Sequence, residues 1–387
     1  MKLAARAANL AASETMAVSA RAAAMRARGI DVISFAAGEP DAPPPPEAIA
    51  ALTDSLARGE TRYPSVLGLP ELRHAIAQRF ARRTLVPFEA DEVVVTTGAK
   101  FALWATFQAL VGPGDEVVVP TPAWVSYPAQ IALAGGRAVS VARRFEDAFR
   151  LDPDAIASAI TPRTVGLVLN SPHNPTGLID PPEVLAALAE LAIRHDLWIV
   201  TDEIYADLYL DGRPAPSILS GRDDLKSRVI VIDGVSKSYA LTGFRVGFLT
   251  APAPCREAVG KLLSQTTSGV STFVQRAALA AINVGDAYVA NARSTYARRR
   301  NLVVAGLDRA GWPAHRPEGA FYALADVRAL QLPDATIAAM LLDDTHVAVV
   351  PGSAFGAPGF VRLSFACSDD RLADGLERLA NWRLQPT

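Results

Sequence analysis

Short runs of β-branched and aliphatic residues alternate along this chain with longer segments in which apolar residues recur at helical spacing. Each short run predicts a strand that is buried on both faces. These runs fall at residues 93–97, 116–119, 166–170, 198–202 and 229–233. Between two of them, residues 182–194 place Leu185, Leu188 and Leu191 on one face, which predicts an amphipathic helix. The alternation favours an α/β fold with a mainly parallel sheet covered by helices on both sides.

The pattern changes near both ends of the chain. Four successive prolines at residues 43–46 cannot lie inside a helix, so they mark a joint. A polar, arginine-rich helical segment at 288–307 then leads into fresh apolar runs at 321–324 and 347–350, which predict further strands. We therefore predict a large domain over residues 45–290 and a smaller α+β domain. Residues 1–44, which also supply an N-terminal arm, and residues 291–387 would form it together.

Composition narrows the class of protein. Half of the 387 residues are hydrophobic and a fifth are charged, which is typical of a soluble globular protein. The formal net charge is −2, from 38 basic and 40 acidic side chains, so we expect no nucleic-acid partner. No apolar run approaches the roughly 20 residues that cross a bilayer, so we expect no membrane association.

The cysteines and histidines give no sign of a metal or a disulfide framework. The two cysteines, Cys255 and Cys367, are too few and too far apart, and the five histidines have no ligand spacing. We therefore expect no metal and a reducing, cytoplasmic location. Residues 1–28 are rich in alanine and arginine like a targeting peptide, but Glu14 interrupts them and an apolar central region is missing. A folded arm and helix is the better interpretation.

Polar residues follow three of the predicted strands, where ligands settle in open α/β sheets. Residues 170–177 follow one strand, residues 202–205 end the next, and Lys237 follows a third within residues 234–245. Taken alone, each segment is also typical of a turn or a helix cap. The lysine segment, however, places an amine beside hydroxyl and guanidinium groups suited to an anion. Such an amine can capture an aldehyde cofactor as a Schiff base.

Together these segments resemble those of the class I aminotransferases, pyridoxal phosphate enzymes of fold type I. The likeness extends to residues 37–41 and 360–364, so it covers essentially the whole chain. It implies a seven-stranded type of sheet between helices, and a homodimer with active sites at the subunit interface. The chain looks most similar to the bacterial aspartate aminotransferase subgroup, some members of which also accept prephenate.

The resemblance assigns a role to each residue around the cofactor, pyridoxal 5'-phosphate. Lys237 would bind it covalently and then carry the substrate α-proton, for which its amine must lose its charge. Asp202 would pair with the ring nitrogen. Tyr205, one helical turn from Asp202, and Asn174 would donate hydrogen bonds to the phenolic oxygen, and Trp124 would stack on the ring.

The phosphate needs backbone amides, a hydroxyl and positive charge. A predicted strand ends at Thr97 and a helix follows, so the amides of that helix start would point at an anion. By resemblance, the phosphate-binding residues are Gly98, Ala99, Lys100, Ser236 and Arg245. Tyr63 resembles the family tyrosine that reaches the phosphate of the neighbouring subunit.

Substrate binding is also assigned by resemblance. Arg362 would hold the α-carboxylate in a bidentate pair, with Asn174, Trp124 and the backbone near Gly38 completing the pocket. A second carboxylate would be bound by Lys100, Ser13 and Thr15, which favours aspartate, glutamate and prephenate. The alternative is that Lys100 only lies near the phosphate while Ser13 and Thr15 cap the first helix.

Two positions depart from the family pattern. Some relatives have a serine where this chain has Gly234, so one phosphate hydroxyl is missing, and the common Asn-Asn turn is here His173-Asn174. We interpret His173 as a turn residue rather than a titrating group. The predicted activity is ping-pong transfer of an amino group between an amino acid and a 2-oxo acid. The alternatives are an aminotransferase for neutral or aromatic amino acids, a carbon–sulfur lyase, and a cofactor-binding protein without turnover.

Overall fold

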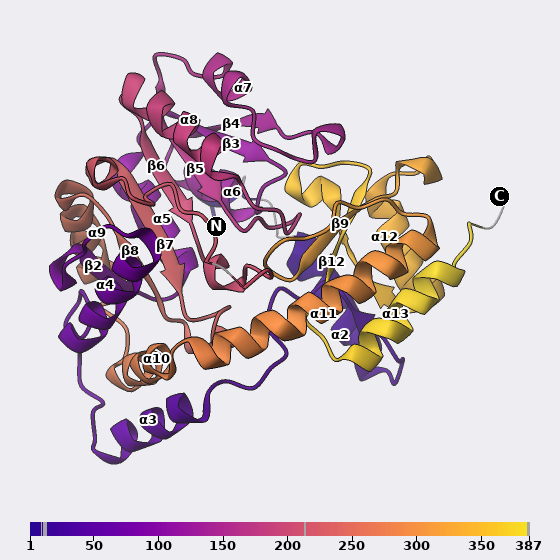
Figure 1. Cartoon of the computed structure of the whole chain (residues 1–387), viewed down its shortest axis with the longest axis horizontal. Helices are drawn as coiled ribbons and strands as arrows, with labels where there is room; N and C mark the ends of the chain where they lie inside the picture. Colours follow the sequence, from indigo (N-terminus) through magenta and orange to yellow (C-terminus); the bar gives the residue numbers. More distant parts are fainter. Residues whose placement is uncertain (9, 11–13, 213, 385–387) are drawn as a thin grey trace.

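The computed structural model describes residues 1–8, 10, 14–212 and 214–384, and a large sheet forms its centre (Figure 1). The strands of this sheet are β2 (Val93–Thr96), β3 (Glu116–Thr121), β4 (Arg137–Ala142), β5 (Thr164–Asn170), β6 (Trp198–Asp202), β7 (Val229–Gly234) and β8 (Gly247–Thr250). They lie in the order β2-β8-β7-β6-β5-β3-β4. β8 is antiparallel to β2 and β7, and the other pairs are parallel. The prediction of a mainly parallel α/β sheet is confirmed.

Neighbouring side chains of these strands enter two different hydrophobic cores, because successive residues of a strand point to opposite faces. In β5, Leu167 and Leu169 belong to one core and Val168 to the other. In β7, Val231 belongs to the first of these cores and Ile230 to the second. A sheet that is apolar on both faces has to be covered by helices on both.

Two sets of helices provide that cover (Figure 1). One face carries α4 (Pro70–Thr84), α8 (Pro182–Arg194) and α10 (Thr272–Val284), and the other carries α5 (Ala99–Leu110), α6 (Ser126–Leu133) and α9 (Ala253–Thr266). α4, α8 and α9 each have a proline in the first turn, where the backbone N–H needs no helical partner. α8 has the bounds that the leucine spacing predicts.

A second body is built from both ends of the chain, beside the carboxyl ends of the central strands. Its strands are β9 (Tyr322–Asp326), β11 (Val350–Pro351) and β12 (Phe360–Ser364), which form an antiparallel sheet, and β1 (Ile33–Ser34) and β10 (Val347–Ala348), which pair in parallel. Its helices are α2 (Glu14–Ala27), α11 (Asp286–Ala310), α12 (Asp334–Thr345) and α13 (Asp369–Asn381). The single strand predicted at 347–350 is wrong, because Val349 separates two short strands that join different sheets.

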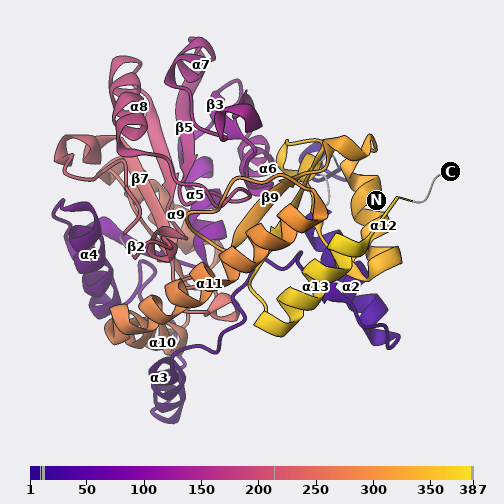
Figure 2. The ribbon, with the colours of Figure 1, turned by 45° about the vertical axis from the view of Figure 1, so that its right-hand side comes forward.

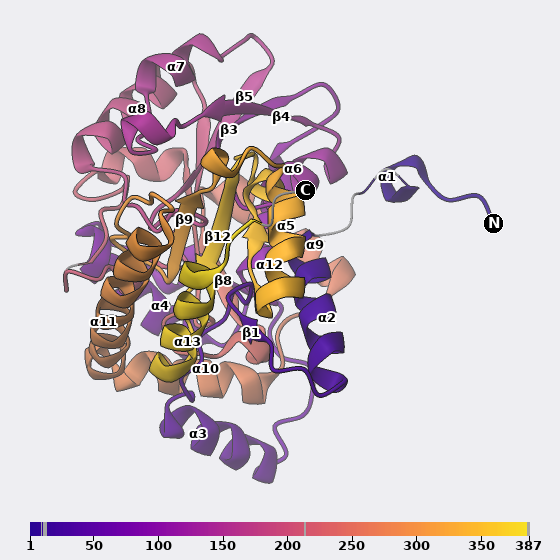
Figure 3. The same cartoon turned by 90° about the vertical axis from the view of Figure 1, so that its right-hand side faces the viewer.

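Long α11 runs from the end near α10 to the second body, where it packs on α13 (Figure 2). The predicted boundary at 290/291 falls inside this continuous helix and stays a prediction. The other helices are α1 (Ala5–Ala8), α3 (Pro46–Ala57) and α7 (Pro153–Ser158). α3 packs on α10 outside the main layers, and α1 stands away from the rest of the molecule (Figure 3). Within the described ranges, every helix is too short or too polar to cross a bilayer.

Candidate active site

A cavity of about 920 Å³ opens at the carboxyl ends of β5 and β6, between the central sheet and the second body. This is where ligands bind in open α/β sheets. The structure gathers most of the predicted site residues along its wall. They are Thr15, Gly38, Ala99, Lys100, Trp124, Asn174, Asp202, Tyr205, Ser236, Lys237, Arg245 and Arg362.

Lys237 lies in the loop after β7 and is partly buried. Its Nζ donates a hydrogen bond to the carbonyl oxygen of Gly38 at 2.5 Å. Burial lowers the pKa of Lys237 to about 8; the carboxylate of Glu39 opposes this shift, and the guanidinium groups of Arg245 and Arg362 add to it. The amine is therefore far easier to deprotonate than an ordinary lysine, as a nucleophile and proton carrier must be.

Asp202 is the last residue of β6 and is buried beside the cavity. Its Oδ2 accepts a hydrogen bond from the hydroxyl of Tyr127 at 2.8 Å, and its Oδ1 accepts one from the amide of Ile204 at 3.3 Å. Burial raises the pKa of Asp202 to about 6, against the effect of these hydrogen bonds. A carboxylate in this environment is ready to pair with a cationic ring nitrogen. The sequence reasoning did not predict the role of Tyr127, although it lies three residues from Trp124.

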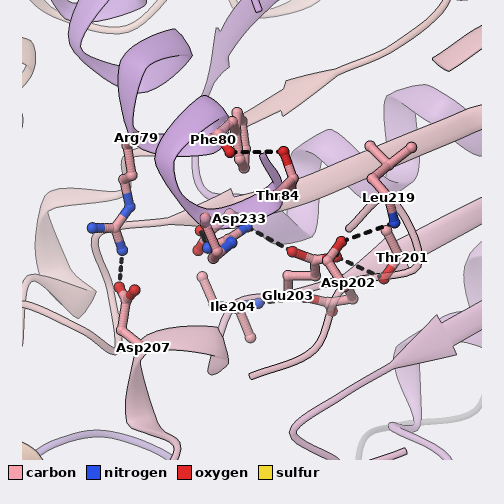
Figure 4. Close-up of polar contacts among 12 residues, drawn as sticks. Arg79, Phe80, Thr84, Thr201, Asp202, Glu203, Ile204, Asp207, Leu219 and Asp233 are labelled. Atoms are coloured by element: carbon pink, nitrogen blue, oxygen red, sulfur yellow. Dashed lines mark hydrogen bonds and ion pairs between the residues drawn. The ribbon is translucent and has the colours of Figure 1, made fainter. Parts of the chain in front are cut away.

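Behind Asp202, an arginine from α4 joins the ends of two central strands. The Arg83 guanidinium lies 2.7 Å from Glu203, which follows β6, and 2.7 Å from Asp233 in β7. All three side chains are at most 4% exposed. The charges of Glu203 and Asp233 add to the raised pKa of Asp202. Figure 4 shows these residues, with the separate pair of Arg79 and Asp207 to one side. This buried cluster ties together the strand ends that carry Asp202 and the Lys237 loop, and the sequence reasoning did not predict it.

Arg362 lies on β12 and is 3% exposed. Its guanidinium donates to the side-chain oxygen of Asn174 at 3.1 Å and to the carbonyl of Ala36 at 2.9 Å. The guanidinium carbon lies over the ring of Tyr322, 4.5 Å from its centre, and over that of Phe355, 4.9 Å from its centre, so two aromatic rings support the group. The buried Nε has no hydrogen-bond partner within the structure, which suits a site that receives a carboxylate.

Tyr205 is buried on the same side of the cavity, and its hydroxyl lies 2.9 Å from the hydroxyl of Tyr322. The prediction that Tyr205 lies one helical turn from Asp202 is wrong. Residues 203–205 form a turn, and the short 3₁₀ helix η3 starts only at Ala206. The chain turns here as it leaves the end of β6. This turn allows the side chains of both Asp202 and Tyr205 to reach the cavity.

The start of α5 lies beside the guanidinium of Arg245. Gly98 precedes α5 with φ of 80°, and a Cβ there would lie 2.6 Å from an Arg245 nitrogen, so glycine is required. Gly98 itself is outside the residues that line the cavity, whereas Ala99 and buried Ser236 line it. Helix-start amides, a hydroxyl and a guanidinium are the kinds of group that bind a phosphate.

Comparison with known proteins places the chain in a family. The family described as "Aminotransferase class I and II" matches residues 30–379. The chain belongs to this family. It is 43% identical over 372 residues to the probable aspartate/prephenate aminotransferase of Thermus aquaticus, covering 95% of this chain and 96% of that protein. It is 40% identical to the aspartate aminotransferase of Bacillus subtilis (strain 168), with 98% of each covered.

Solved structures give the same result. The aspartate aminotransferase from Thermus thermophilus with maleate has a TM-score of 0.94 at 42% identity, covering 98% of this chain and 99% of that chain. The aspartate aminotransferase from Rhizobium meliloti has a TM-score of 0.94 at 38% identity, covering 98% of each chain. The protein is thus a transaminase with the fold of these enzymes, as the resemblance of its motifs implied.

Besides Gly98, two of the predicted residues of this aminotransferase, Ser13 and Tyr63, are not among the described residues that line the cavity. Ser13 lies outside the described residues. Tyr63 is 92% exposed and is absent from the cavity lining, while Thr15, in the first turn of α2, does line the cavity. The ammonium of Lys100 lies 4.8 Å from the ring centre of Trp124, and burial, with Arg245, lowers the pKa of Lys100.

The two departures from the family pattern have structural reasons. A Cβ at Gly234 would lie 2.9 Å from the carbonyl oxygen of Val246, the residue just before β8, so a serine would have to displace this backbone. His173 is buried, and its ring nitrogens lie 2.8 Å from the Thr176 hydroxyl and 2.9 Å from the Pro122 carbonyl. Burial, together with Arg143, holds the pKa of His173 well below its usual range. The ring therefore fixes a loop and does not titrate near neutral pH.

Proposed function

We propose that this aminotransferase uses pyridoxal 5'-phosphate to move the α-amino group of aspartate or glutamate to a 2-oxo acid, with prephenate as a further acceptor. The observation that carries the proposal is a pair of cations on the wall of one cavity, Arg362, which is buried, and Lys100, which is exposed to solvent. Two separated cations suit a substrate with two carboxylates. The names of the similar Thermus aquaticus and Bacillus subtilis enzymes support the same substrate class.

The residues of the cavity fit pyridoxal phosphate. The absence of a side chain at Gly98 lets the Arg245 guanidinium lie against the start of α5, and Ala99, Ser236 and Arg245 line the cavity together, as a phosphate site requires. Asp202 is a buried carboxylate for the ring nitrogen, and Trp124 supplies an aromatic face. When bound, the cofactor supplies an aldehyde that holds the amino group and a ring that accepts the electrons left by the α-proton.

With the cofactor bound, the side chains of the cavity would bind the substrate, orient it and transfer its α-proton. Arg362 binds and orients the α-carboxylate, with Asn174 held against it by a hydrogen bond. Lys237, whose pKa is lowered to about 8, accepts the α-proton and returns it. Asp202 keeps a proton on the ring nitrogen, and Tyr205 donates to the phenolic oxygen. The second body covers the cavity and excludes water.

We also propose a cytoplasmic homodimer. The exposed ring of Tyr63 cannot act in the cavity of its own subunit as the structure places it, so its assigned role needs a second subunit. Exposed apolar side chains near the N-terminus, in α2 and in α3, including Leu10, Met16 and Leu56, support burial in such an interface.

Single-turnover half-reactions test the proposed substrate class. Lys100→Ser is expected to lower kcat/KM for aspartate about 10- to 100-fold, because the second carboxylate loses its cation, and to change that for alanine or phenylalanine about threefold or less. The measurement is the change in visible absorbance of the loaded enzyme on mixing with each amino acid. Lys237→Ala, which should show no such absorbance of a covalent link, is the control.

Equal losses of kcat/KM for all three amino acids would overturn the proposal of a dicarboxylate substrate. Lys100 would then only contribute to binding the cofactor phosphate. Release of ammonia and pyruvate without any need for a 2-oxo acid would instead indicate a lyase.

A further inference from the structure

Tyr322 lies between two groups to which the proposed function gives roles. It begins β9, is buried, and lines the cavity. Its ring faces the guanidinium of Arg362 at 4.5 Å, and its hydroxyl lies 2.9 Å from the hydroxyl of Tyr205. A Cβ built on Gly38 would lie 3.1 Å from that hydroxyl, so the backbone of residue 38 closes against it on another side.

The chemistry of two phenols sets the direction of this hydrogen bond. Each hydroxyl carries one proton, and burial raises the pKa of both tyrosines, so both stay neutral across the working pH range. If Tyr205 donates its proton into the cavity, it can only accept from Tyr322. Donation from Tyr322 then polarises the Tyr205 hydroxyl and makes it a stronger donor.

We propose that Tyr322 is a positioning residue for transamination, which donates its hydroxyl hydrogen to Tyr205 and so directs Tyr205 toward the phenolic oxygen of the cofactor. The inference rests on the proposed function, because it needs the role assigned to Tyr205. The ring of Tyr322 has a separate task, since it supports the flat guanidinium of Arg362.

Tyr322→Phe removes the hydroxyl and keeps the ring under Arg362. The loaded enzyme has a visible absorbance that titrates with the proton on the link between Lys237 and the cofactor. A donor to the phenolic oxygen competes with that proton for the oxygen's electrons, so a weaker donor raises the titration pKa. We expect Tyr322→Phe to raise it by about half a unit and Tyr205→Phe by about one unit or more.

The double variant decides whether Tyr322 acts through Tyr205. In the Tyr205→Phe background, Tyr322→Phe is expected to add no further shift, because its acceptor is gone. We also expect Tyr322→Phe to lower kcat about three- to tenfold while KM for aspartate changes less than about twofold, because the ring beneath Arg362 remains.

Tyr296→Phe is the matched control. Tyr296 is buried in the same core as Tyr322 and packs against Phe321, with ring centres 5.3 Å apart, but it is outside the residues that line the cavity. Its loss of a phenolic hydroxyl should leave the titration unchanged. Far-ultraviolet circular dichroism and urea unfolding of each variant establish that the fold is kept.

The possible outcomes separate the inference from the proposed function. If Tyr205→Phe shifts the titration and Tyr322→Phe does not, the role of Tyr322 is overturned and the proposed function stands. A shift from Tyr322→Phe that persists in the Tyr205→Phe background also overturns it. If Tyr205→Phe itself shifts nothing, the assignment of Tyr205 in the proposed function is wrong.

Discussion

At the level of one residue, the buried carboxylate of Asp202 serves the proposed chemistry but lowers the stability of the folded protein. The pKa of Asp202 is raised from 3.8 to about 6 by burial, so the folded protein binds this proton more tightly than the unfolded chain does. Its contribution to stability is therefore complete below about pH 4 and is lost as the pH rises through 6. At neutral pH the ionised carboxylate destabilises the protein without cofactor.

Asp202→Asn is expected to stabilise the cofactor-free protein by roughly 2–3 kcal/mol at pH 7, because the amide has no charge to bury. The gain should shrink toward zero as the pH falls to about 4. Urea unfolding at a series of pH values measures it, and transamination by the same variant should be strongly reduced. An asparagine variant that is less stable than the parent protein at pH 7 would contradict this account.

The residues of the site could be predicted to different extents from the sequence. Lys237, Asp202 and Arg362 stand in segments whose neighbours identify them, and all three reach the cavity. Tyr127 and Tyr322 could not be found in that way. Tyr127 acts through Asp202, 75 positions away, and Tyr322 contacts Tyr205, 117 positions away. Only folding brings such pairs together, and a lone tyrosine in a sequence is as typical of a core as of a site.

At the level of elements, α4 stabilises the strand ends behind the site through Arg83. Removing one partner of a buried ion cluster leaves the other charges uncompensated, so Arg83→Met is expected to cost about 3–5 kcal/mol of unfolding free energy. Arg79, one turn earlier on α4, pairs with Asp207 and is more exposed, which makes Arg79→Met the matched control with a smaller expected loss. Urea unfolding of the cofactor-free variants measures both.

Adding Glu203→Gln to Arg83→Met should recover part of the stability, because it removes one of the two stranded carboxylates. Equal destabilisation by the two arginine variants would show that the cluster is no more important than an ordinary ion pair on the same helix.

The sequence predicted the strands whose side chains are buried on both faces of the sheet. Strands β2, β3, β5, β6 and β7 coincide with predicted runs because their residues are apolar on both faces. β4 was not predicted, since this edge strand alternates more and less exposed residues and carries Arg137 at its start. β8 was not predicted either, because it is only four residues long, begins with glycine and starts two positions after the lysine segment ends at Arg245.

At the level of the whole molecule, the assembly in the proposal can be tested through Tyr63. Mixing Tyr63→Ala with Lys237→Ala subunits should restore activity at limiting pyridoxal phosphate. In a hybrid dimer, one site then contains both defects and the other contains neither. With random pairing, about a quarter of all sites would be intact. Each variant alone, refolded in the same way, is the control, and no restoration in a sample that sediments as dimers would show that Tyr63 does not serve its partner.

The main chain at residues 36–38 contributes to the site through its carbonyl oxygens, which affects what mutagenesis can reveal about it. The carbonyl of Ala36 accepts from Arg362 and the carbonyl of Gly38 accepts from Lys237, so one short peptide contacts both of these site residues. No exchange of side chains can delete a main-chain oxygen. A mutational scan of residues 36–38 would therefore report only which side-chain sizes fit there. It would not detect the hydrogen bonds that the two main-chain carbonyls accept, because every substitution keeps those carbonyls.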